Sequence, residues 1–342
     1  MLYYYRGDFL VKVAPVVSGQ TRKHLMSDFP HPAQADRPEQ PFSNRPAPEW
    51  PPASRAIDYP AFEQMVAADP ALQGHPQAIT WRVNGEIIMA LGWGRAILMQ
   101  IAHPKVAAGV GQHSHFSSSP AAKAQRFLNT LNRMLTLTYG TPLEAWQAAH
   151  AIDTIHNRVN GQDENQARYS ARDPELLKWV HATFADSMFK TYEMFVGPLS
   201  RAEKDEYLHH ASFVAPLLGA PLDYFPGNQA ELDAYLAGML ESDTLKVGPQ
   251  ARQLADYVLE RLPIPVVGRV LQWYARLLVG GMLPPVLRQA YGFKVGKGGE
   301  RALQVTAWIY RHLVHPILPP ALRRWKVARQ AVRDFKAKNP AF

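Results

Sequence analysis

The apolar and polar positions of this chain recur with the spacing of helices. Two long segments, residues 78–101 and 121–138, are apolar on more than one face, which is typical of helices buried in a core. Alternating runs rich in Val, Ile and Thr are missing, and no Asn-Gly or Asp-Gly pair separates two such runs. No pattern repeats at a fixed period. The sequence therefore predicts an all-α fold.

Capping residues mark the points at which several further helices begin. A Ser, Thr, Asp or Asn side chain can accept a hydrogen bond from the free N–H groups of a helix start, and proline fits the first helical turn. A Glu three residues after the cap adds a reciprocal bond. Such starts occur at Ser119-Pro120, Thr141-Pro142-Leu143-Glu144, Asp173-Pro174-Glu175, Ser200-Arg201-Ala202-Glu203 and Asn228-Gln229-Ala230-Glu231.

The N-terminal part of the chain differs in composition from the rest. Nine prolines lie between residues 28 and 60, which excludes a regular helix or a central strand there and predicts an extended arm. We therefore expect an N-terminal extension over residues 1–74, which includes this proline-rich arm. Residues 75–342 are expected to form a single large helical domain.

Neither a signal peptide nor a membrane-spanning helix is expected from the sequence. The first apolar run follows the acidic Asp8 and is broken by Lys12 and Pro15. The best later candidate for a span, residues 262–287, is interrupted by Arg269 and Arg276. These features predict a cytoplasmic protein.

Composition excludes several kinds of chemistry. The chain has no cysteine, so disulfides, iron–sulfur clusters, thiolate ligation of haem and thiol catalysis are excluded. Its net charge of +8 indicates anionic partners, but no nucleic-acid-binding module is present, and we expect no nucleic acid partner. Gly-rich phosphate loops and the Gly-x-Ser-x-Gly motif are also missing, which argues against nucleotide binding and serine hydrolysis.

The C-terminal region is strongly basic. Residues 311–338 contain eight Lys or Arg and a single acid, and the aromatic residues Trp308, Tyr310 and Trp325 lie beside or among them. This composition is typical of a solvated basic helix, or of a helix that makes a peripheral membrane contact. Both interpretations stay open at the level of sequence.

The most distinctive region combines positive charge with a complete lack of carboxylates. No Asp or Glu occurs between Glu86 and Glu144, and His156 follows shortly afterwards. A cationic helical region close to a histidine suits an anionic cofactor that carries a metal at its centre. The cations of this region are Arg95, Lys105, Lys123, Arg126 and Arg133.

Five short segments follow one another in a characteristic order. They are Gln100-Ile101-Ala102-His103-Pro104, Val110-Gly111-Gln112-His113-Ser114, Arg126-Phe127-Leu128-Asn129-Thr130, Ile155-His156-x-x-Val159-x-Gly161 and Tyr169-x-Ala171-x-Asp173-Pro174-Glu175-Leu176-Leu177. In this order and spacing they resemble the mpaB-type oxygenase family, whose members include the rubber oxygenases, also called latex-clearing proteins. The resemblance covers roughly residues 78–325.

The resemblance implies a globin-like helical core around haem b. His156 matches the histidine that is the proximal iron ligand in the family. Arg126 and Thr130 match the pair that lies over the distal side, and their i, i+4 spacing places both on one helix face. The resemblance therefore implies a haem-dependent oxygenase that acts with dioxygen on a small apolar substrate.

Two positions differ from the pattern of the rubber oxygenases. Those proteins carry a lysine immediately before the threonine, where this chain has Asn129. They also carry an acid upstream of the arginine, where this chain offers only Gln112, His113 and His115. We therefore expect an apolar substrate other than polyisoprene, and no protein side chain as the sixth iron ligand.

The surroundings of His156 suggest how it would be oriented and how the cofactor would be held. Asp153 precedes His156 by about one helical turn and could accept a hydrogen bond from its second ring nitrogen. Arg126, Arg133 or Arg158 would pair with the haem propionates. A hydrogen-bonded core histidine is the alternative interpretation of His156.

Other histidines and aromatic residues need their own interpretation. His103 precedes Pro104 and is expected to end its helix by bonding the last free carbonyls. Gln112 and His113 lie next to a Gly- and Ser-rich connection and would form part of the distal wall, or else a surface loop. His181 is expected to be a buried structural histidine, and Trp81 and Trp93 are expected to fill the core.

Two further hypotheses remain beside the haem oxygenase. Helical bundles with two iron or manganese ions use Glu-x-x-His motifs together with extra carboxylates. Glu206 and His209, and likewise Asp153 and His156, have this spacing, but carboxylates are scarce on the predicted core helices. The second hypothesis is a non-catalytic protein that binds haem or a lipid, which oxygen consumption would separate from an oxygenase.

Overall fold

A computed structural model describes residues 56–69, 72, 76–113, 120–221, 223–259 and 268–339. For residues 120–128 and 268–272 it describes the backbone alone. Most of the predicted N-terminal extension, including the proline-rich arm up to residue 55, lies outside the described residues. The architecture is all-α, as the sequence predicts, with one small two-stranded sheet in the described part of the chain.

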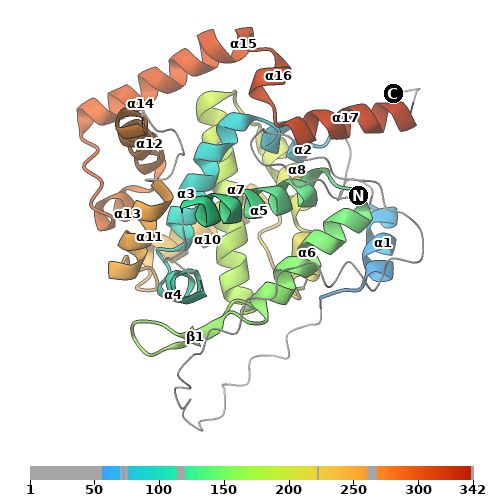
Figure 1. Cartoon of the computed structure of the whole chain (residues 1–342), viewed down its shortest axis with the longest axis horizontal. Coiled ribbons are helices and arrows are strands. Elements are labelled where there is room, and N and C mark those ends of the chain that lie inside the picture. The colour runs from blue at the N-terminus through green and yellow to red at the C-terminus, as the bar shows by residue number, and fades with distance from the viewer. Residues whose placement is uncertain are drawn as a thin grey trace. The chain divides into compact units, whose positions relative to one another are not determined.

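Helix α7 (Pro174–Phe195) is the central element of the helical body (Figure 1). It begins at the predicted cap, where the Asp173 side chain accepts from the Glu175 N–H and proline occupies the first turn. Its principal neighbour is α3 (Ala90–Gln100). Trp179 and Met188 of α7 are fully buried in the main hydrophobic core. Trp81 and Trp93 are buried in the same core, which confirms their predicted role.

Helices α3 and α7 approach each other closely at Gly92. A Cβ atom at this position would lie 2.7 Å from Thr191 Oγ1 and 2.8 Å from Met188 Cε. The small residues Thr183, Ser187 and Thr191 repeat every fourth position on α7 and are fully buried. Thr183 and Ser187 turn their hydroxyls onto carbonyls of their own helix, so no hydroxyl is left unsatisfied at either position.

The predicted helix over residues 78–101 is wrong as a single element. The structure divides it into α2 (Ile79–Asn84), the short 3-10 helix η2 (Ile87–Met89) and α3. The break falls at Gly85, whose carbonyl accepts from the Trp325 N–H at 2.9 Å, and at Glu86, which forms an isolated bridge with Arg324. The backbone groups at the break are therefore bonded by the distant segment that contains Arg324 and Trp325, and not by the next turn of a continuous helix.

Helices α5 (Pro120–Tyr139) and α6 (Pro142–His156) form a hairpin with a very short connection. The connection is short because Thr141 and Glu144 form the predicted capping box at the start of α6. Helix α1 (Tyr59–Ala68) lies within the predicted N-terminal extension and packs against α6, with the rings of Tyr59 and Trp146 5.9 Å apart.

A β-hairpin follows α6 and leads into α7. Its strands β1 (Asn160–Gln162) and β2 (Arg168–Ser170) are antiparallel, and Gly161 pairs with Tyr169. Helix α4 (Pro104–His113) packs against both strands. The hairpin therefore connects the end of α6 with the start of α7 and with α4.

The remaining helices surround this centre. The predicted caps of α8 and α10 are confirmed, since Ser200 accepts from the Glu203 N–H and Asn228 from the Glu231 N–H. No helix in the described part of the chain is long and apolar enough to cross a membrane. The bounds are α8 Arg201–Ala211, α9 Val214–Leu217, α10 Gln229–Glu241, α11 Pro249–Leu259, α12 Gly268–Met282, α13 Pro285–Ala290 and α14 Lys297–Ile309.

The basic C-terminal region is broken on either side of α16. It contains the π-helix η3 (Tyr310–Val314), α15 (His315–Ile317), α16 (Pro320–Arg323) and α17 (Lys326–Lys338). The predicted basic helix is therefore not continuous: Leu318 and Pro319 separate α15 from α16, and Arg324 and Trp325 separate α16 from α17. Pro319 and Pro320 lack the N–H groups that a continuous helix needs.

Candidate functional site

His156 is the last residue of α6 and has one ring nitrogen without a hydrogen-bond partner. Its Nδ1 atom is buried, and no described group donates to it or accepts from it. Burial lowers the pKa of His156 below its usual value of 6.5, and the nearby Arg172 lowers it further, whereas Asp153 opposes the shift. The imidazole is therefore neutral near pH 7, which is the protonation state that can bind a metal ion.

Asp153 is engaged by an arginine that the sequence analysis did not consider. The Arg172 Nε donates to Asp153 Oδ1 at 2.9 Å, and Arg172 Nη2 donates to Asp153 Oδ2 at 2.8 Å. Both oxygens of this buried carboxylate are thus bound in a bidentate ion pair. Asp153 forms no hydrogen bond with His156, so the expected orienting contact is wrong for this structure.

The predicted distal residues lie on α5, the helix that packs beside α6 (Figure 1). Arg126 in the first half of α5 and His156 at the end of α6 both lie away from the Gly140–Thr141 connection, and Thr130 lies near the middle of α5. Asn129 and Thr130 are exposed; of Arg126 the backbone alone is described. The hairpin therefore places the predicted distal residues and the predicted iron ligand on neighbouring helices.

Two of the predicted cofactor-binding cations lie near this hairpin. Arg133 is half-buried on α5, and Arg158 is exposed just after α6 ends. Arg95, in contrast, is buried against α7, where it pairs with Asp186 at 2.7 Å and donates to Ser187 Oγ. The Arg95 guanidinium therefore serves the core and is not accessible to a bound anion.

Gln112 and His113 are held by the β-hairpin. Tyr169 donates its hydroxyl to Gln112 Oε1 at 2.8 Å, and Gln112 Nε2 donates to the Gln162 carbonyl at 2.7 Å. His113 Nε2 lies 3.2 Å from the Asn160 carbonyl oxygen. These contacts fix the end of α4 on the hairpin that follows His156. His115, the third residue of this cluster, lies outside the described residues.

His103 caps the start of a helix, so its predicted role at a helix end is wrong. Its Nδ1 accepts a hydrogen bond from the Lys105 N–H at 3.2 Å, at the first turn of α4. Carbonyls at the end of α3 would need a ring N–H donor, whereas this nitrogen is an acceptor. Burial lowers the pKa of His103 to about 4, so the neutral form persists in the folded protein.

Two more histidines carry a buried ring nitrogen without a partner in the described part of the chain. His181 stacks on Phe225 with ring centroids 4.3 Å apart, and burial lowers its pKa to about 4. His210 on α8 is also buried, and its Nδ1 lacks a partner. Sequence reasoning missed these free nitrogens, because only tertiary packing decides whether a donor reaches a buried ring. Both are therefore natural comparison residues for His156.

The spacing that suggested a dimetal site does not produce one. His209 Nε2 lies 2.6 Å from Asp69 Oδ2 at the surface, and Glu206 approaches His210 rather than a second metal-binding motif. Asp153 is occupied by Arg172. Within the described residues no three His, Asp or Glu side chains gather in a group that could hold a metal ion.

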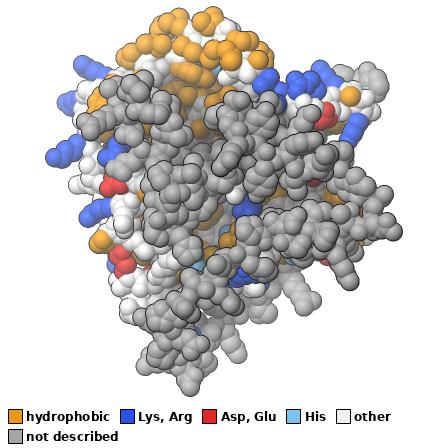
Figure 2. Space-filling view, in the orientation of Figure 1, with side chains coloured by type: hydrophobic (Ala, Val, Ile, Leu, Met, Phe, Trp, Pro, Cys, Tyr) orange, Lys and Arg blue, Asp and Glu red, His pale blue; other side chains and the backbone are white. Residues whose placement is uncertain are grey.

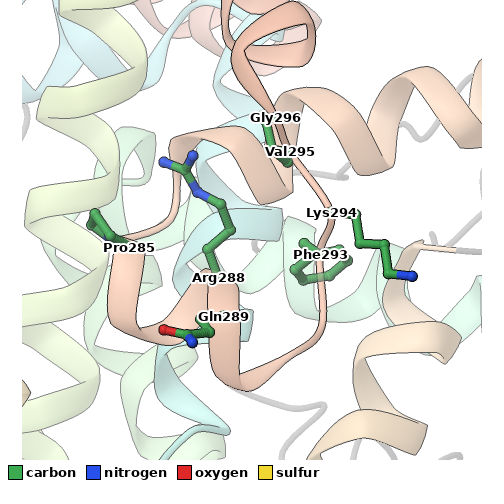
Figure 3. Close-up of a pocket in the computed structure, with 7 residues that line it drawn as sticks. All are labelled: Pro285, Arg288, Gln289, Phe293, Lys294, Val295 and Gly296. Carbon is green, nitrogen blue, oxygen red and sulfur yellow. The ribbon is translucent and has the colours of Figure 1, made fainter.

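In the described part of the chain, two of the surface cavities lie away from His156. The larger, of about 380 Å³, lies between Pro285 and Gly296 (Figure 3). Its Arg288 side chain already pairs with Glu300 at 2.8 Å. The smaller, of about 150 Å³, lies between α4, the β-hairpin and α11. Neither is lined by a predicted catalytic or cofactor-binding residue, so the candidate site rests on the α5–α6 hairpin.

The donor chemistry at the end of α6 fits a ligand of a haem iron. Haem needs a single neutral imidazole from the protein, and His156 offers one with an unengaged nitrogen. The neighbouring helix α5 contains no Asp or Glu, so no carboxylate of this helix would repel the haem propionates.

Comparison with known proteins gives one family match. The sequence profile described as "ER-bound oxygenase mpaB/B'/Rubber oxygenase, catalytic domain" matches residues 81–312. This range contains α5, α6, the β-hairpin and α7. Searches of curated proteins and of solved structures found no match.

Proposed function

The chain belongs to the mpaB/rubber oxygenase catalytic-domain family, and on that premise we propose that it is a haem b-dependent oxygenase acting with dioxygen on an apolar substrate. Membership of an oxygenase family supports an oxidoreductase. The haem, the iron ligand and the substrate class are the proposed part. The observation that carries the proposal is the half-buried, neutral imidazole of His156, whose Nδ1 atom is buried without a partner.

His156 would be the residue that ligates the haem iron. Its position at the end of α6 is held by the Asp153–Arg172 ion pair one helical turn earlier, which ties α6 to the segment before α7. Because burial keeps the ring neutral, no proton must leave it before a metal can bind at neutral pH. The imidazole is thus ready for ligation in the folded apoprotein.

The cations of the α5–α6 hairpin would hold the propionates. Arg133, Arg158 and Arg126 are the candidates, since guanidinium groups pair with carboxylates in a bidentate geometry. Arg172 is not among them, because it already binds Asp153. Of these candidates, Arg133 is half-buried, Arg158 is exposed, and Arg126 lies on the first half of α5.

A bound haem supplies the redox chemistry that activates dioxygen. On the distal side, Thr130 and Arg126 would donate hydrogen bonds to dioxygen and stabilise negative charge as it develops there. Asn129 carries no amine, so it leaves more room on that side than a lysine would. We therefore propose a substrate other than polyisoprene.

Absorption spectra of the purified protein test this proposal directly. We expect a Soret band and a haem b pyridine adduct for wild type, and loss of both in His156→Ala. His181→Ala is the matched control, because His181 also has a buried nitrogen without a partner; it should retain the haem. A colourless wild-type protein that takes up no added haem would refute the proposal, as would haem that survives in His156→Ala and is lost in His181→Ala.

Oxygen consumption separates an oxygenase from a haem carrier. Haem-loaded protein is mixed with a panel of alkenes and isoprenoids, and dissolved oxygen is followed with an electrode. Substrate-dependent uptake that is lowered in Thr130→Val and Arg126→Gln supports the oxygenase. Tight haem binding without uptake for any apolar compound would instead identify a haem-binding protein.

A further inference from the structure

An exposed apolar surface covers the segment from α14 to α16. Figure 2 shows it as a continuous cap of hydrophobic side chains at one end of the view. Ile317 is 80% exposed and Leu322 is 65% exposed, although both are large aliphatic residues. We call this surface the apolar tip; it consists of Val305, Trp308, Ile309, Leu313, Ile317 and Leu322.

The apolar tip is not the outer side of an ordinary amphipathic helix. Helix α14 buries Leu303 and Ala307 against the rest of the protein, and yet Val305 and Trp308 point away from that contact. A surface helix normally places polar residues on its outer face. Because the C-terminal part of α14 exposes Val305, Trp308 and Ile309, its outer face there is suited to an environment other than water.

Proline residues shape the outermost part of the tip. The helical hydrogen bonding ends at the Leu318 N–H, which donates to the Val314 carbonyl, and the extended residues Leu318 and Pro319 turn the chain between α15 and α16. Ile317 and Leu322 lie on either side of this turn. Two bulky aliphatic side chains thus project from a short turn, where they could enter an apolar layer without carrying a long stretch of backbone with them.

Positive charge lies beside the tip on α17. The buried Ala328 faces the protein, and Trp325, at the start of the helix, stacks on Trp93 with ring centroids 5.6 Å apart and planes inclined by 7°. The opposite side of α17 presents exposed cations, seen beside the hydrophobic cap in Figure 2. These cations are Lys326, Arg333, Lys336 and Lys338, and Asp334 is the single acid of the helix.

We propose that the apolar tip and the exposed cations of α17 form a peripheral binding surface for an anionic lipid bilayer. Large apolar side chains flanked by Lys and Arg are what an interfacial segment needs, because the former enter the acyl boundary while the latter meet the headgroups. A second copy of this chain fits less well, since tip-to-tip contact would bring two basic α17 helices together. The surface extends beyond the family match, which ends at residue 312.

Vesicle flotation with the full-length protein tests this surface. The probe is vesicles of phosphatidylcholine with about one-third phosphatidylserine, compared with phosphatidylcholine alone. We expect the protein to float with the anionic vesicles, to bind the neutral ones more weakly, and to be released as salt is raised. Wild-type protein that stays at the bottom of the gradient with both kinds of vesicle would overturn the proposal.

Two sets of variants separate the apolar and the charged contributions. Ile317→Ser with Leu322→Ser should weaken binding to both vesicles by at least about tenfold, since each removes a large side chain from the apolar layer. Lys326→Gln with Lys336→Gln should weaken binding to anionic vesicles by about fivefold per charge, with little change on neutral ones. The control is Val286→Ser on α13, which is 50% exposed and lies outside the tip.

Circular dichroism and analytical ultracentrifugation complete the test. All of these side chains are exposed, so each variant should keep the helical content of wild type. A dimer that disappears in Ile317→Ser with Leu322→Ser, without vesicle binding by wild type, would assign the tip to a second copy and refute the bilayer. Equal loss of flotation in Val286→Ser would refute the assignment to the tip. Neither result depends on haem, so this proposal can fail while the proposed oxygenase stands.

Discussion

Asp153 and Arg172 form a bidentate ion pair, with donor–acceptor distances of 2.9 and 2.8 Å, one helical turn before His156. The pair joins the last turn of α6 to the residues between β2 and α7. Arg172 also reaches Asn157 Oδ1 at 3.4 Å. The position of His156 therefore depends on a contact with a residue that lies outside its own helix.

Removing the cation from this pair should destabilise the protein. Arg172→Gln leaves the buried Asp153 carboxylate without its partner, and we expect the free energy of unfolding to fall by about 3 kcal/mol. Urea denaturation followed by circular dichroism measures the change. Adding Asp153→Asn should recover part of the loss, because no buried charge then remains unpaired.

The matched control for this prediction is an exposed pair. Arg276 and Asp256 are 2.7 Å apart, and the Asp256 side chain is 61% exposed. Arg276→Gln should cost less than about 1 kcal/mol. Equal losses for Arg172→Gln and Arg276→Gln would contradict a special role of the buried pair.

Adding a methyl group at Gly92 should destabilise the protein. In Gly92→Ala the new Cβ would collide with Thr191 Oγ1 and Met188 Cε, and α3 and α7 would have to separate. We expect a loss of about 2 kcal/mol in the free energy of unfolding. Gly238→Ala is the control with the opposite sign: nothing lies near its Cβ position on α10, so it should stabilise the protein by up to about 1 kcal/mol. A neutral Gly92→Ala would show that the helices can move apart freely.

His103 should make the stability of the protein depend on pH. Burial lowers the pKa of His103 to about 4, from the usual 6.5, with Lys105 adding to the shift and Asp163 opposing it. As pH falls from 6.5 toward 4, the unfolded chain binds a proton that the folded protein does not. The free energy of unfolding is therefore greatest above pH 6.5. Up to about 3 kcal/mol of it is lost as the pH falls from 6.5 to about 4.

The substitution His103→Asn tests this linkage. The asparagine oxygen can still accept from the Lys105 N–H, so the cap of α4 is kept while the titrating group is removed. We expect the difference in unfolding free energy between pH 7 and about pH 4.5 to shrink in His103→Asn. An unaltered pH dependence in His103→Asn would show that other groups carry it.

Asn129→Lys should restore the amine that the rubber oxygenases carry before the distal threonine. If the proposed haem site is correct, the variant should show the spectrum of a six-coordinate iron and bind added cyanide about tenfold more weakly or worse. Asn165→Lys, an exposed position in the β-hairpin turn, is the surface control. Identical spectra for wild type and Asn129→Lys would place Asn129 away from the iron.

Local sequence was sufficient for the helix starts. Thr141 with Glu144, Asp173 with Pro174, and Ser200 with Glu203 cap their helices as expected. Each of these bonds joins groups at most three residues apart, so no other part of the chain has to be known. The all-α class followed in the same way from helical periodicity and from the lack of alternating runs.

Contacts between distant segments decided the rest. The break at Gly85 arises because Trp325 donates to its carbonyl, and the Asp153 carboxylate is bound by Arg172 instead of His156. The exposure of Ile317 likewise follows from which helix faces pack together. The sequence by itself therefore determined the class of fold, the helix starts and the family of this protein. Only the tertiary structure decided which polar groups find partners and which apolar side chains stay in water, because both depend on residues brought together from far along the chain.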